Sequence, residues 1–391
     1  MNFNESKLGD LCEIRAGGTP SRSNSEYWYN GDIPWIKIGD INNKYVKNAS
    51  EYITVDGLNN SSAKLFKKGT ILYTIFATVG EVAILDFDAT TNQAIVGLNH
   101  NEKIDTNYLY YFLKSQKDKI SNIGRGVAQN NINMSILRDI KVPIPDKNVQ
   151  LKISEVLDNA QVLIDKRKKQ IEELDLLVKS KFIEMFGDPV LNSKGWQKGK
   201  IADIIVKTQY GTSNKADEFN GDFKVLRMNN ITYDGNWDFT SIKYVNLDDK
   251  EQKKYLVYKG EVLFNRTNSK ELVGKTAVYK EDEPMAYAGY LVKAIPNERA
   301  NGEFISAYMN TKYVKDKLLN MAKNIVGMAN INAEEFKKID VYIPPIELQN
   351  QFADFVKQVD KLKFEMEKSL KELEDNFNSL MQKAFKGELF N

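Results

Sequence analysis

The sequence contains one cysteine, Cys12, and one histidine, His100, among its 391 residues. One thiol cannot form an intramolecular disulfide, and one thiol with one imidazole cannot build a thiolate or imidazole metal cluster. The sequence also lacks a run of about 18 apolar residues, and residues 1–11 are polar and include acids, so we expect neither a membrane span nor a secretory signal. These absences predict a cytoplasmic protein with no metal site.

Neither sign of charge is in excess, because 55 basic residues face 53 acidic ones and the formal net charge is +2. This balance neither indicates nor excludes nucleic acid as a partner, since binding depends on local patches. A hydrophobic content of 42% is enough for real cores, and the length suits two or three domains.

What the sequence does contain is a long internal repeat. Residues 130–150 read NNINMSILRDIKVPIPDKNVQ, residues 329–349 read ANINAEEFKKIDVYIPPIELQ, and eight of the 21 aligned positions are identical at an offset of 199. Earlier segments also correspond, GDIPWIKIGDI with GDFKVLRMNNI and KGTIL with KGEVL, at offsets down to 190. Each repeat is therefore about 190 residues long, and the two start near Leu8 and Ile201.

Within each repeat, apolar strand-like pieces alternate with turns rich in Gly, Asn and Asp. We expect one helix in this part of each copy, over residues 105–120 and 303–321. A short capped helix follows, in which Asn332 is the N-cap and Glu335 completes a capping box. The apolar strand IKVPIP or IDVYIP then closes the repeat.

Long charged segments without Gly or Pro come next, at residues 149–186 and 348–386. Their apolar residues recur in alternating steps of three and four, the spacing of a coiled-coil seam. Each helix would be about 54 Å long, and the two most simply pack on each other. An antiparallel pair would place residues 166–169 (KRKK) beside Glu365 and Glu367, a surface match of under about 1 kcal/mol per pair.

These patterns predict an α/β (α+β) fold in which two pseudo-symmetric globular domains are joined by two long antiparallel coiled-coil helices. The first domain is expected over residues 1–148 and the second over 188–346. The helices are expected over residues 149–187 and 347–391, and the whole as a rigid dumbbell with near two-fold internal symmetry.

Several motifs recur in a fixed order along essentially the whole chain. They are LGDLCEIRAGGTPSRSNSEYW and GDIPWIKIGDI, TVGEVAIL, TNQAIVGL, the NNIN and ANIN turns before VPIP and VYIPP, and the helix ends KSKFIEMFGDP and LMQKAFKGEL. No single tetrapeptide is diagnostic, but the order, used twice before a long helix, is highly specific. In this order the sequence resembles the specificity subunit of type I restriction-modification systems.

The resemblance implies two target recognition domains, each reading one half of a bipartite double-stranded DNA site, with the helix pair as the ruler between them. Half-sites one helical turn apart lie about 34 Å from each other, which is comparable with the expected helix length. The resemblance also implies two methyltransferase subunits that modify adenine and, in the restriction form, two translocating endonuclease subunits. S-adenosylmethionine, ATP and Mg belong to those partners, so no cofactor is expected on this chain.

The sequence lacks motifs for catalysis. Residues 274–276 (GKT) suggest a phosphate loop, but Ser269 stands where that loop needs glycine. Residues 124–129 (GRGVAQ) follow a predicted helix and lack the third glycine of a dinucleotide fingerprint. Residues 343–346 (IPPI) lack the polar start and aromatic end of an adenine methyltransferase site. We read the chain as non-catalytic, with a two-headed scaffold for protein or glycan as the alternative and an autonomous DNA enzyme disfavoured.

Loops rich in Arg, Lys, Asn, Gln, Ser and Thr are the candidate DNA contacts, because these side chains read base edges and hold phosphates. The glycines of these loops would let the backbone approach the duplex, and ordinary turns are the alternative for each loop. In the first repeat the candidates are Gly18, Thr19, Ser21, Arg22, Thr78, Asn92, Gln93, Arg125 and Gln129. In the second they are Asn214, Lys215, Arg227, Asn229, Asn265, Arg266, Asn268 and Lys270. The run NRTNSK at residues 265–270 is the strongest loop.

The two copies should read different bases, so positions where they diverge are expected to read DNA and positions where they agree to form architecture. Thr74 and Ile75 against Asn265 and Arg266 are one such divergence. Apolar residues at the helix tips are expected to dock the methyltransferase, together with the exposed remainder of the helices. They are Phe182, Met185, Phe186, Met381, Phe385 and Leu389.

Overall fold

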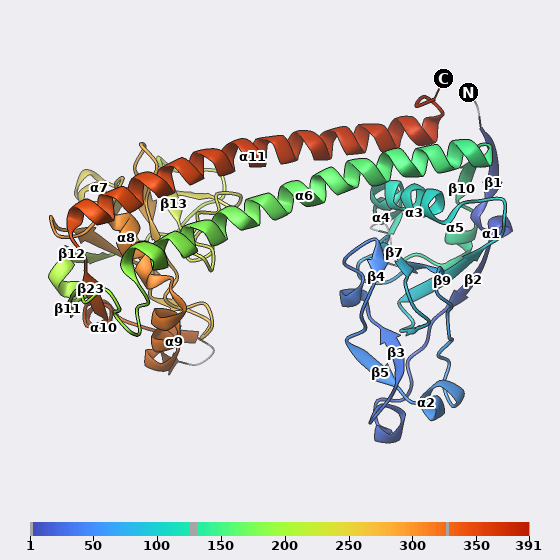
Figure 1. The fold of residues 1–391 in the computed structure, drawn as a ribbon, viewed down its shortest axis with the longest axis horizontal. Helices are drawn as coiled ribbons and strands as arrows, with labels where there is room; N and C mark the ends of the chain where they lie inside the picture. The colour runs from blue at the N-terminus through green and yellow to red at the C-terminus, as the bar shows by residue number, and fades with distance from the viewer. Residues whose placement is uncertain (1–2, 125–130, 326–327, 391) are drawn as a thin grey trace. The chain divides into compact units, whose positions relative to one another are not determined.

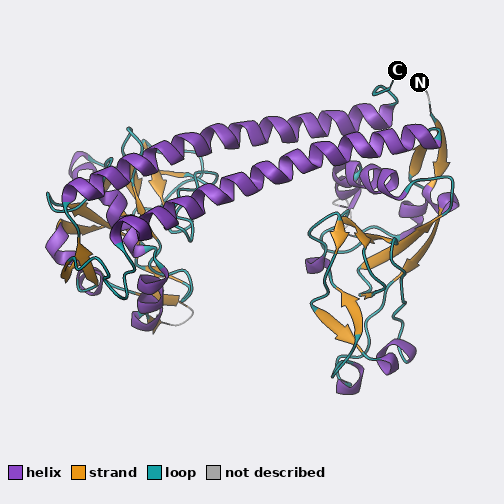
Figure 2. Cartoon of the chain, in the orientation of Figure 1, coloured by secondary structure: helices purple, strands orange, loops and turns teal. Residues whose placement is uncertain are grey.

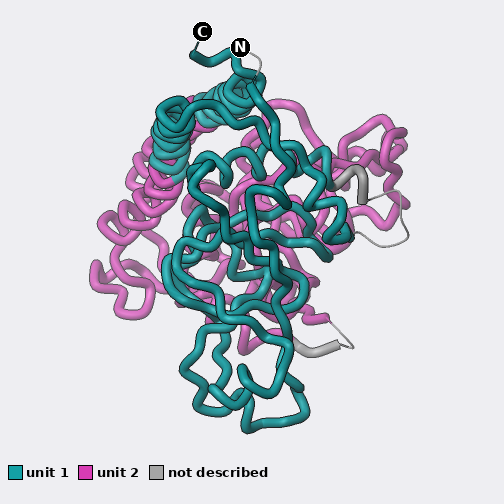
Figure 3. The backbone as a smooth tube through the Cα atoms, turned by 90° about the vertical axis from the view of Figure 1, so that its right-hand side faces the viewer, with its two compact units in different colours: residues 1–168, 368–391 teal, residues 169–367 magenta. Residues whose placement is uncertain are grey.

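The computed structural model describes residues 3–124, 131–325 and 328–390 (Figure 1). The chain divides into one unit of Met1–Lys168 with Lys368–Asn391 and a second of Lys169–Glu367 (Figure 3). Each unit contains a globular part, called head 1 or head 2, and part of each long helix, α6 (Lys147–Phe186) and α11 (Ile346–Lys386) (Figure 2). No helix in the described ranges is long and apolar enough to cross a membrane.

Head 1 is built from short strands and helices. The strands are β1 (Asn4–Lys7), β2 (Cys12–Ala16), β3 (Ile33–Ile36), β4 (Tyr45–Val46), β5 (Glu51–Ile53), β6 (Ile71–Thr74), β7 (Val82–Leu85), β8 (Thr90–Thr91), β9 (Ile95–His100) and β10 (Lys141–Ile144). The helices are α1 (Leu8–Leu11), α2 (Val55–Asn59), α3 (Thr106–Ser115), α4 (Lys117–Gly124) and α5 (Met134–Arg138), with the 3-10 turns η1 (Ser25–Tyr27) and η2 (Ile38–Asp40).

Head 2 repeats this plan. The strands are β11 (Gln197–Lys200), β12 (Ile205–Tyr210), β13 (Phe223–Leu226), β14 (Lys243–Val245), β15 (Leu256–Val257), β16 (Val262–Asn265), β17 (Thr267–Asn268), β18 (Thr276–Val278), β19 (Met285–Tyr287), β20 (Leu291–Pro296), β21 (Lys323–Ile325), β22 (Met328–Asn330) and β23 (Asp340–Ile343). The helices are η3 (Ile201–Ile204), α7 (Asp249–Tyr255), α8 (Gly302–Met309), α9 (Lys312–Met321) and α10 (Ala333–Lys337).

The sheet topology confirms the repeat. The order β2-β9-β6-β7 in head 1 matches β12-β20-β16-β18 in head 2, and β5-β3-β8 matches β14-β13-β19. The match includes the direction of pairing, because β3 with β8 and β13 with β19 are both parallel. The central strands β6 and β16 are fully buried, as their continuous apolar sequence predicts. In head 2, β17-β22-β21 form a small sheet in which Thr267 pairs with Asn330, and the antiparallel bridge of Phe76 with Asn131 is its equivalent in head 1.

The glutamine that closes the repeated connector makes the same three hydrogen bonds in both heads. Its amide oxygen accepts from the backbone N–H that precedes α3 or α8, and its amide nitrogen donates to two backbone carbonyls. The partners are Asp105, Lys103 and Pro145 for Gln150, and Asn301, Arg299 and Pro344 for Gln349. Both glutamines are buried, so this latch ties the start of each long helix to its own head.

The predicted caps are confirmed, but the predicted single helix of each head is wrong. Asn332 caps α10 in a capping box with Glu335, and Asn133 caps α5 through its side-chain oxygen. Instead of one helix, each head has two consecutive ones, α3 and α4 or α8 and α9. In head 2, Thr311 separates α8 from α9, because its hydroxyl caps α9 by accepting from the N–H of Val314.

The long helices are antiparallel, as predicted. In the first unit Ile153 and Leu157 of α6 share one core with Met381 of α11, and in the second unit Phe182 of α6 contacts Phe352 of α11. The predicted charge match has a different register. Lys168 pairs with Glu374 at 2.8 Å, not with Glu365 or Glu367. Buried residues, rather than weak surface ion pairs, set this register.

Candidate nucleic-acid interface

Four segments meet at one edge of the main sheet in head 1. They are the turn after β2, the turn before β9, the segment after β6 and the residues that precede α5. Backbone hydrogen bonds join them: Gly17 donates to Ile95 at 3.0 Å, Ile75 to Ala94 at 2.8 Å and Ile132 to Ile75 at 3.1 Å. We call this region the loop edge of head 1.

Head 2 has the same loop edge. Gly211 donates to the carbonyl of Leu291 at 3.2 Å, as Gly17 does to Ile95. Arg266 takes the place of Ile75, because its N–H donates to Tyr290 at 3.0 Å and its carbonyl accepts from Ile331 at 2.9 Å. In each head, the loop edge is therefore held together by the same set of backbone hydrogen bonds, which we call its frame.

The structure brings Gly18, Thr19, Asn92 and Gln93 together at the loop edge of head 1. The hydroxyl of Thr19 donates to the side-chain oxygen of Gln93, and the N–H of Gly18 donates to the carbonyl of Thr91 at 2.9 Å. The side chain of Asn92 accepts from Ala94 at 3.0 Å. Thr78 lies in the exposed turn after β6, on the same frame. Predicted polar contacts from separate parts of the chain thus gather at one edge.

The glycines of this edge serve the fold rather than a close approach of the backbone to DNA, which corrects our expectation for Gly18. Gly18 is buried, and its carbonyl accepts from the indole N–H of Trp35 at 3.0 Å. A Cβ on Gly18 would lie 2.3 Å from the carbonyl carbon of Ser62, and one on Gly17 would lie 2.0 Å from the hydroxyl oxygen of Thr91. Only glycine fits this packing.

Arg22 is held by an aromatic and acidic cluster beside the loop edge. Its guanidinium carbon lies 3.6 Å from the centroid of the Trp28 ring and 4.8 Å from that of Trp35. Its charge pairs with Glu51 at 2.5 Å, and Lys37 donates to the same carboxylate at 2.6 Å. The hydrogen bonds from Lys37 and Arg22 lower the pKa of Glu51. The Arg22 side chain still has half of its surface exposed.

The other candidates of the first repeat divide into two groups. Ser21 is exposed, and its hydroxyl lies 2.8 Å from that of Ser23. Arg125 and Gln129 lie outside the described residues.

Arg266 is the best-placed candidate in head 2. Its Nη1 donates to the carbonyl of Gly289 at 3.1 Å, and its guanidinium carbon lies 4.9 Å from the ring centroid of Tyr210. Asn268 belongs to β17, which pairs with β22, and its side-chain oxygen accepts from Ser269 at 2.9 Å. Lys270 is exposed at the end of the same segment. In the NRTNSK loop, Arg266 and Asn268 are therefore partly exposed and Lys270 is exposed.

Asn265 does not belong to this surface, so the expectation that it contacts a base is wrong. It is completely buried at the end of β16, and its side-chain nitrogen donates to the carbonyl of Met228 at 3.3 Å. Neighbouring Lys275, the lysine of the GKT segment, is also buried and donates to Met228 at 2.7 Å and to Ile231. Burial lowers the pKa of Lys275. Both side chains support the core behind the loop edge.

The remaining candidates of head 2 lie on neighbouring loops. Arg227 turns inward and donates to the carbonyl of Ser241 at 2.6 Å, whereas Asn229 is exposed. Asn214 is exposed and donates to Glu251 at 3.0 Å. Lys215 is exposed beside it. Asn214 and Lys215 follow Thr212, which bridges to Ala288 at the loop edge.

The apolar helix tips are covered by the heads, which corrects the expectation that they form a docking surface. Phe182 and Phe186 are buried, and their rings lie 5.8 and 5.0 Å from that of Phe304. The ring of Phe385 lies 5.4 Å from those of Tyr108 and Phe112. Met381 is buried, and Met185 and Leu389 are partly buried against the same cores.

Other apolar residues of the long helices are exposed. In the first unit they are Leu151, Val162 and Leu163, and in the second Leu176, Leu177, Ile183, Leu362 and Phe364. Exposed apolar residues on otherwise charged helices are typical of an interaction surface. We call these eight residues the exposed helix surface.

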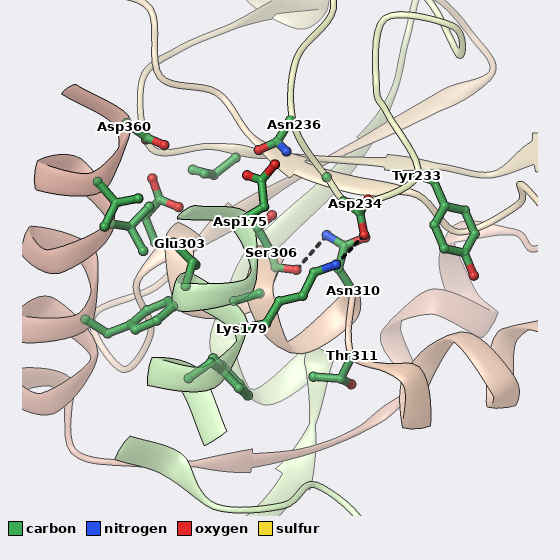
Figure 4. A pocket seen from close by; sticks show the side chains of 18 of the residues that line it. Asp175, Lys179, Tyr233, Asp234, Asn236, Glu303, Ser306, Asn310, Thr311 and Asp360 are labelled. Atoms are coloured by element: carbon green, nitrogen blue, oxygen red, sulfur yellow. Dashed lines mark hydrogen bonds and ion pairs between the residues drawn. The ribbon is translucent and has the colours of Figure 1, made fainter. Parts of the chain in front are cut away.

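The second unit also contains a cavity of about 540 Å³ where head 2 meets the helices (Figure 4). Phe182, Phe352 and Val356 are among its apolar lining, and Lys179 pairs with Asp234 at 2.7 Å at its rim. None of the candidate DNA contacts that the structure describes lines it. The cavity is therefore a joint between head and helices and not part of the loop edge.

Comparison with known proteins places these features in a family. The sequence model for the "Type I restriction modification DNA specificity domain" matches twice, at residues 1–175 and 193–375. The MjaIX specificity subunit of Methanocaldococcus jannaschii is 32% identical over 227 residues, which are 53% of this chain and 52% of that protein. The match thus spans about half the length of that relative. The EcoKI specificity subunit of Escherichia coli K12 is 25% identical over 76% of this chain and 68% of that protein.

Solved structures share the fold over nearly the whole chain. The S subunit of a type I restriction-modification system from M. genitalium has a TM-score of 0.54 at 18% identity, covering 98% of this chain and 96% of that one. A chain from a structural study of assembly and conformational transition in the type I system has a TM-score of 0.60 at 15% identity, covering 99% and 98%. The predicted architecture of two similar heads and two long antiparallel helices is confirmed.

Proposed function

Because the chain belongs to the family of type I restriction-modification DNA specificity domains, we propose that it recognises a bipartite double-stranded DNA target, with one head on each half-site. The observation that carries the proposal is the double match of the family's DNA specificity domain, once on each repeat. The reading domains would comprise residues 1–148 and 188–346. Each would use its own loop edge.

The two loop edges differ in their side chains, which supports two different half-sites. Thr19, Asn92 and Gln93 offer hydroxyl and amide groups in head 1, whereas Arg266, Asn268 and Lys270 offer cations and an amide in head 2. Amides favour adenine and arginine favours guanine in the major groove. The two heads should therefore select unlike sequences.

The helix pair is proposed as the spacer between the half-sites. At 1.5 Å per residue the 40 residues of α6 and the 41 of α11 span about 60 Å each. Within each unit α6 packs on α11, and we propose that this pairing holds a fixed gap of unread base pairs. The Gln150 latch ties the first turns of α6 to head 1, and the Gln349 latch ties the first turns of α11 to head 2.

The chemistry is proposed to belong to partner subunits. Two methyltransferase subunits would dock on the exposed helix surface and methylate adenine with S-adenosylmethionine. Two restriction subunits that use ATP and Mg could join them in the endonuclease form. This chain would select the target and hold the partners there, without a catalytic group of its own.

Mapping methylated adenines tests the proposal directly. The chain and its methyltransferase are expressed together in a host without other adenine methylation, and the DNA is sequenced with detection of modified bases. The expected result is one motif with two specified parts and a constant unspecified gap. Methylation without a gapped motif, or none at all with both subunits expressed, would refute it.

DNA binding separates this function from that of a scaffold for protein or glycan. The purified complex should bind duplexes that carry the motif, and log affinity should fall by about 0.9 per log of salt for each phosphate contact. A scaffold for protein or glycan would show no such binding.

A further inference from the structure

Three adjacent positions of the loop edge carry very different side chains in the two heads. In head 2 they are Tyr210, Arg266 and Tyr290, and in head 1 they are Ala16, Ile75 and Ala94. The positions correspond by hydrogen bonding, because Arg266 donates to Tyr290 as Ile75 donates to Ala94. Tyr210 ends β12 opposite Val292, as Ala16 ends β2 opposite Val96.

This substitution of three small or apolar residues by two tyrosines and an arginine needs a reason outside the fold. The same backbone frame forms in head 1 without these side chains, so the frame does not require them. Tyr210 and Tyr290 also leave 41% and 47% of their surface exposed, which is unfavourable for residues that only pack. A surface that contacts a partner molecule explains the aromatic and cationic side chains.

The guanidinium of Arg266 is positioned before any ligand binds. One Nη donor is fixed by the carbonyl of Gly289, and the ring of Tyr210 lies beside the cation. Tyr210 is itself held, because its hydroxyl accepts from the N–H of Ala333 at 3.0 Å. Within the described ranges no carboxylate pairs with Arg266, so its charge is available to a ligand.

We propose that Arg266 reads a guanine in the half-site of head 2 and that Tyr210 and Gly289 position it. Guanine presents two acceptors, N7 and O6, at its major-groove edge, and an arginine with two free N–H donors matches them. The guanidinium has five donors, of which Gly289 takes one and the buried Nε is turned inward. The remaining Nη donors are the ones proposed to bind both guanine acceptors.

The inference rests on the proposed function and adds an asymmetry to it. Ile75 has no donor and is only 5% exposed, so head 1 cannot make this contact at the equivalent position. The half-site of head 2 must therefore contain a guanine that depends on Arg266. A phosphate could also pair with Arg266, but such a contact would be the same for every sequence.

The test is to map methylation by the full chain with its methyltransferase for the wild type, Arg266→Ala and Arg266→Lys. In Arg266→Ala, preference for guanine should fall about tenfold to a hundredfold at one position of one half-site, with the other half-site unchanged. Arg266→Lys should also relax that position, because lysine keeps the charge but lacks the paired donors. Arg299→Ala, which removes an exposed arginine of the same head, is the matched control and should leave the motif unchanged.

The outcomes separate the inference from the function. An unaltered base preference in both Arg266 variants, or equal weakening at all sequences, would overturn the guanine contact in favour of a phosphate or structural role. A wild-type protein that gives no gapped motif would instead overturn the proposed function. If Arg266→Ala lowers the melting temperature so far that methylation is lost, the base preference of Arg266→Lys decides between a guanine contact and a phosphate or structural role.

Discussion

At the scale of single residues, the polar run NRTNSK at residues 265–270 lies partly on the surface of head 2 and partly in its core. The NRTNSK run predicted a polar surface, and Arg266 and Lys270 lie there, but Asn265 is buried. Successive side chains of a strand point to opposite faces, and a strand end without known register does not reveal which face is outside. Tyr210 was missed because an aromatic residue at a strand end looks like core. Its alignment with Ala16 was the available signal.

The buried glutamine of the connector predicts a sharp stability effect. Gln349→Ala would leave the N–H of Asn301 and the carbonyls of Arg299 and Pro344 without their partner. Unpaired buried polar groups are costly, so we expect the free energy of unfolding to fall by about 2–3 kcal/mol. Chemical denaturation measures this change. Gln351→Ala, an exposed glutamine in the same helix, is the control and should change it by less than about 0.5 kcal/mol.

The Glu51 cluster predicts a pH dependence in head 1. The hydrogen bonds from Lys37 and Arg22 hold the pKa of Glu51 below its ordinary value of 4.5. The folded state therefore binds the proton less well than the unfolded state, and this stabilisation is present above pH 4.5 and disappears as pH falls through the lowered pKa. Glu51→Gln should lower the free energy of unfolding most at about pH 7 and least in acid. Chemical denaturation at about pH 7 and in acid measures this difference. A constant cost at all pH values would show that the carboxylate charge is not involved.

At the scale of elements, heptad spacing identified both long helices, and the charge match that favoured an antiparallel pair gave the right direction but not the register. Lys168 faces Glu374, about two helical turns beyond Glu367, the nearer of the two acids that the sequence argument used. Acids are frequent along α11, so many registers place one opposite a lysine. The choice among them depends on buried contacts such as Phe182 with Phe352, which a single sequence does not reveal.

The exposed helix surface predicts how the methyltransferase is held. Leu176 and Leu177 are 59% and 47% exposed, and burial of one leucine contributes about 1.5–3 kcal/mol. The two together have about one leucine side chain left to bury, so changing both to Glu should lower affinity for the methyltransferase by at least about tenfold, as measured by titration or co-purification. The melting temperature of the chain should change little, because both side chains already face solvent. Ser180→Glu, at an exposed position of the same helix, controls for added negative charge, and equal loss in that variant would argue against an apolar interface.

At the scale of the whole molecule, the internal repeat was the strongest signal in the sequence. It predicted that both halves have one topology, and the structure adds equivalent backbone hydrogen bonds at the loop edge and at the glutamine latch. The small β17-β22-β21 sheet of head 2 had no such signal, because its strands are only two or three residues long. Duplication accounts for the frame that both heads share, and the proposed function assigns DNA reading to the side chains that differ on that frame.

The spacer proposal predicts that matched deletions shorten the target. Removing residues 166–172 from α6 and 370–376 from α11 takes one heptad from each helix around the Lys168–Glu374 contact, so the seams stay in phase. Seven residues rise about 10 Å and one base pair about 3.4 Å, so the unread gap should shrink by about three base pairs. Matched insertion of a heptad should lengthen it by the same amount, with both half-sites unchanged.

Deletion from α6 alone provides the control for this experiment. It leaves the seams of the two helices unequal in length, so it should destabilise the chain and abolish methylation rather than change the gap. Sequencing of methylated DNA reads the gap directly in each variant. If the matched deletion methylates DNA with the original gap, the helices do not set the distance. The spacing would then have to come from the proposed methyltransferase partners rather than from this chain.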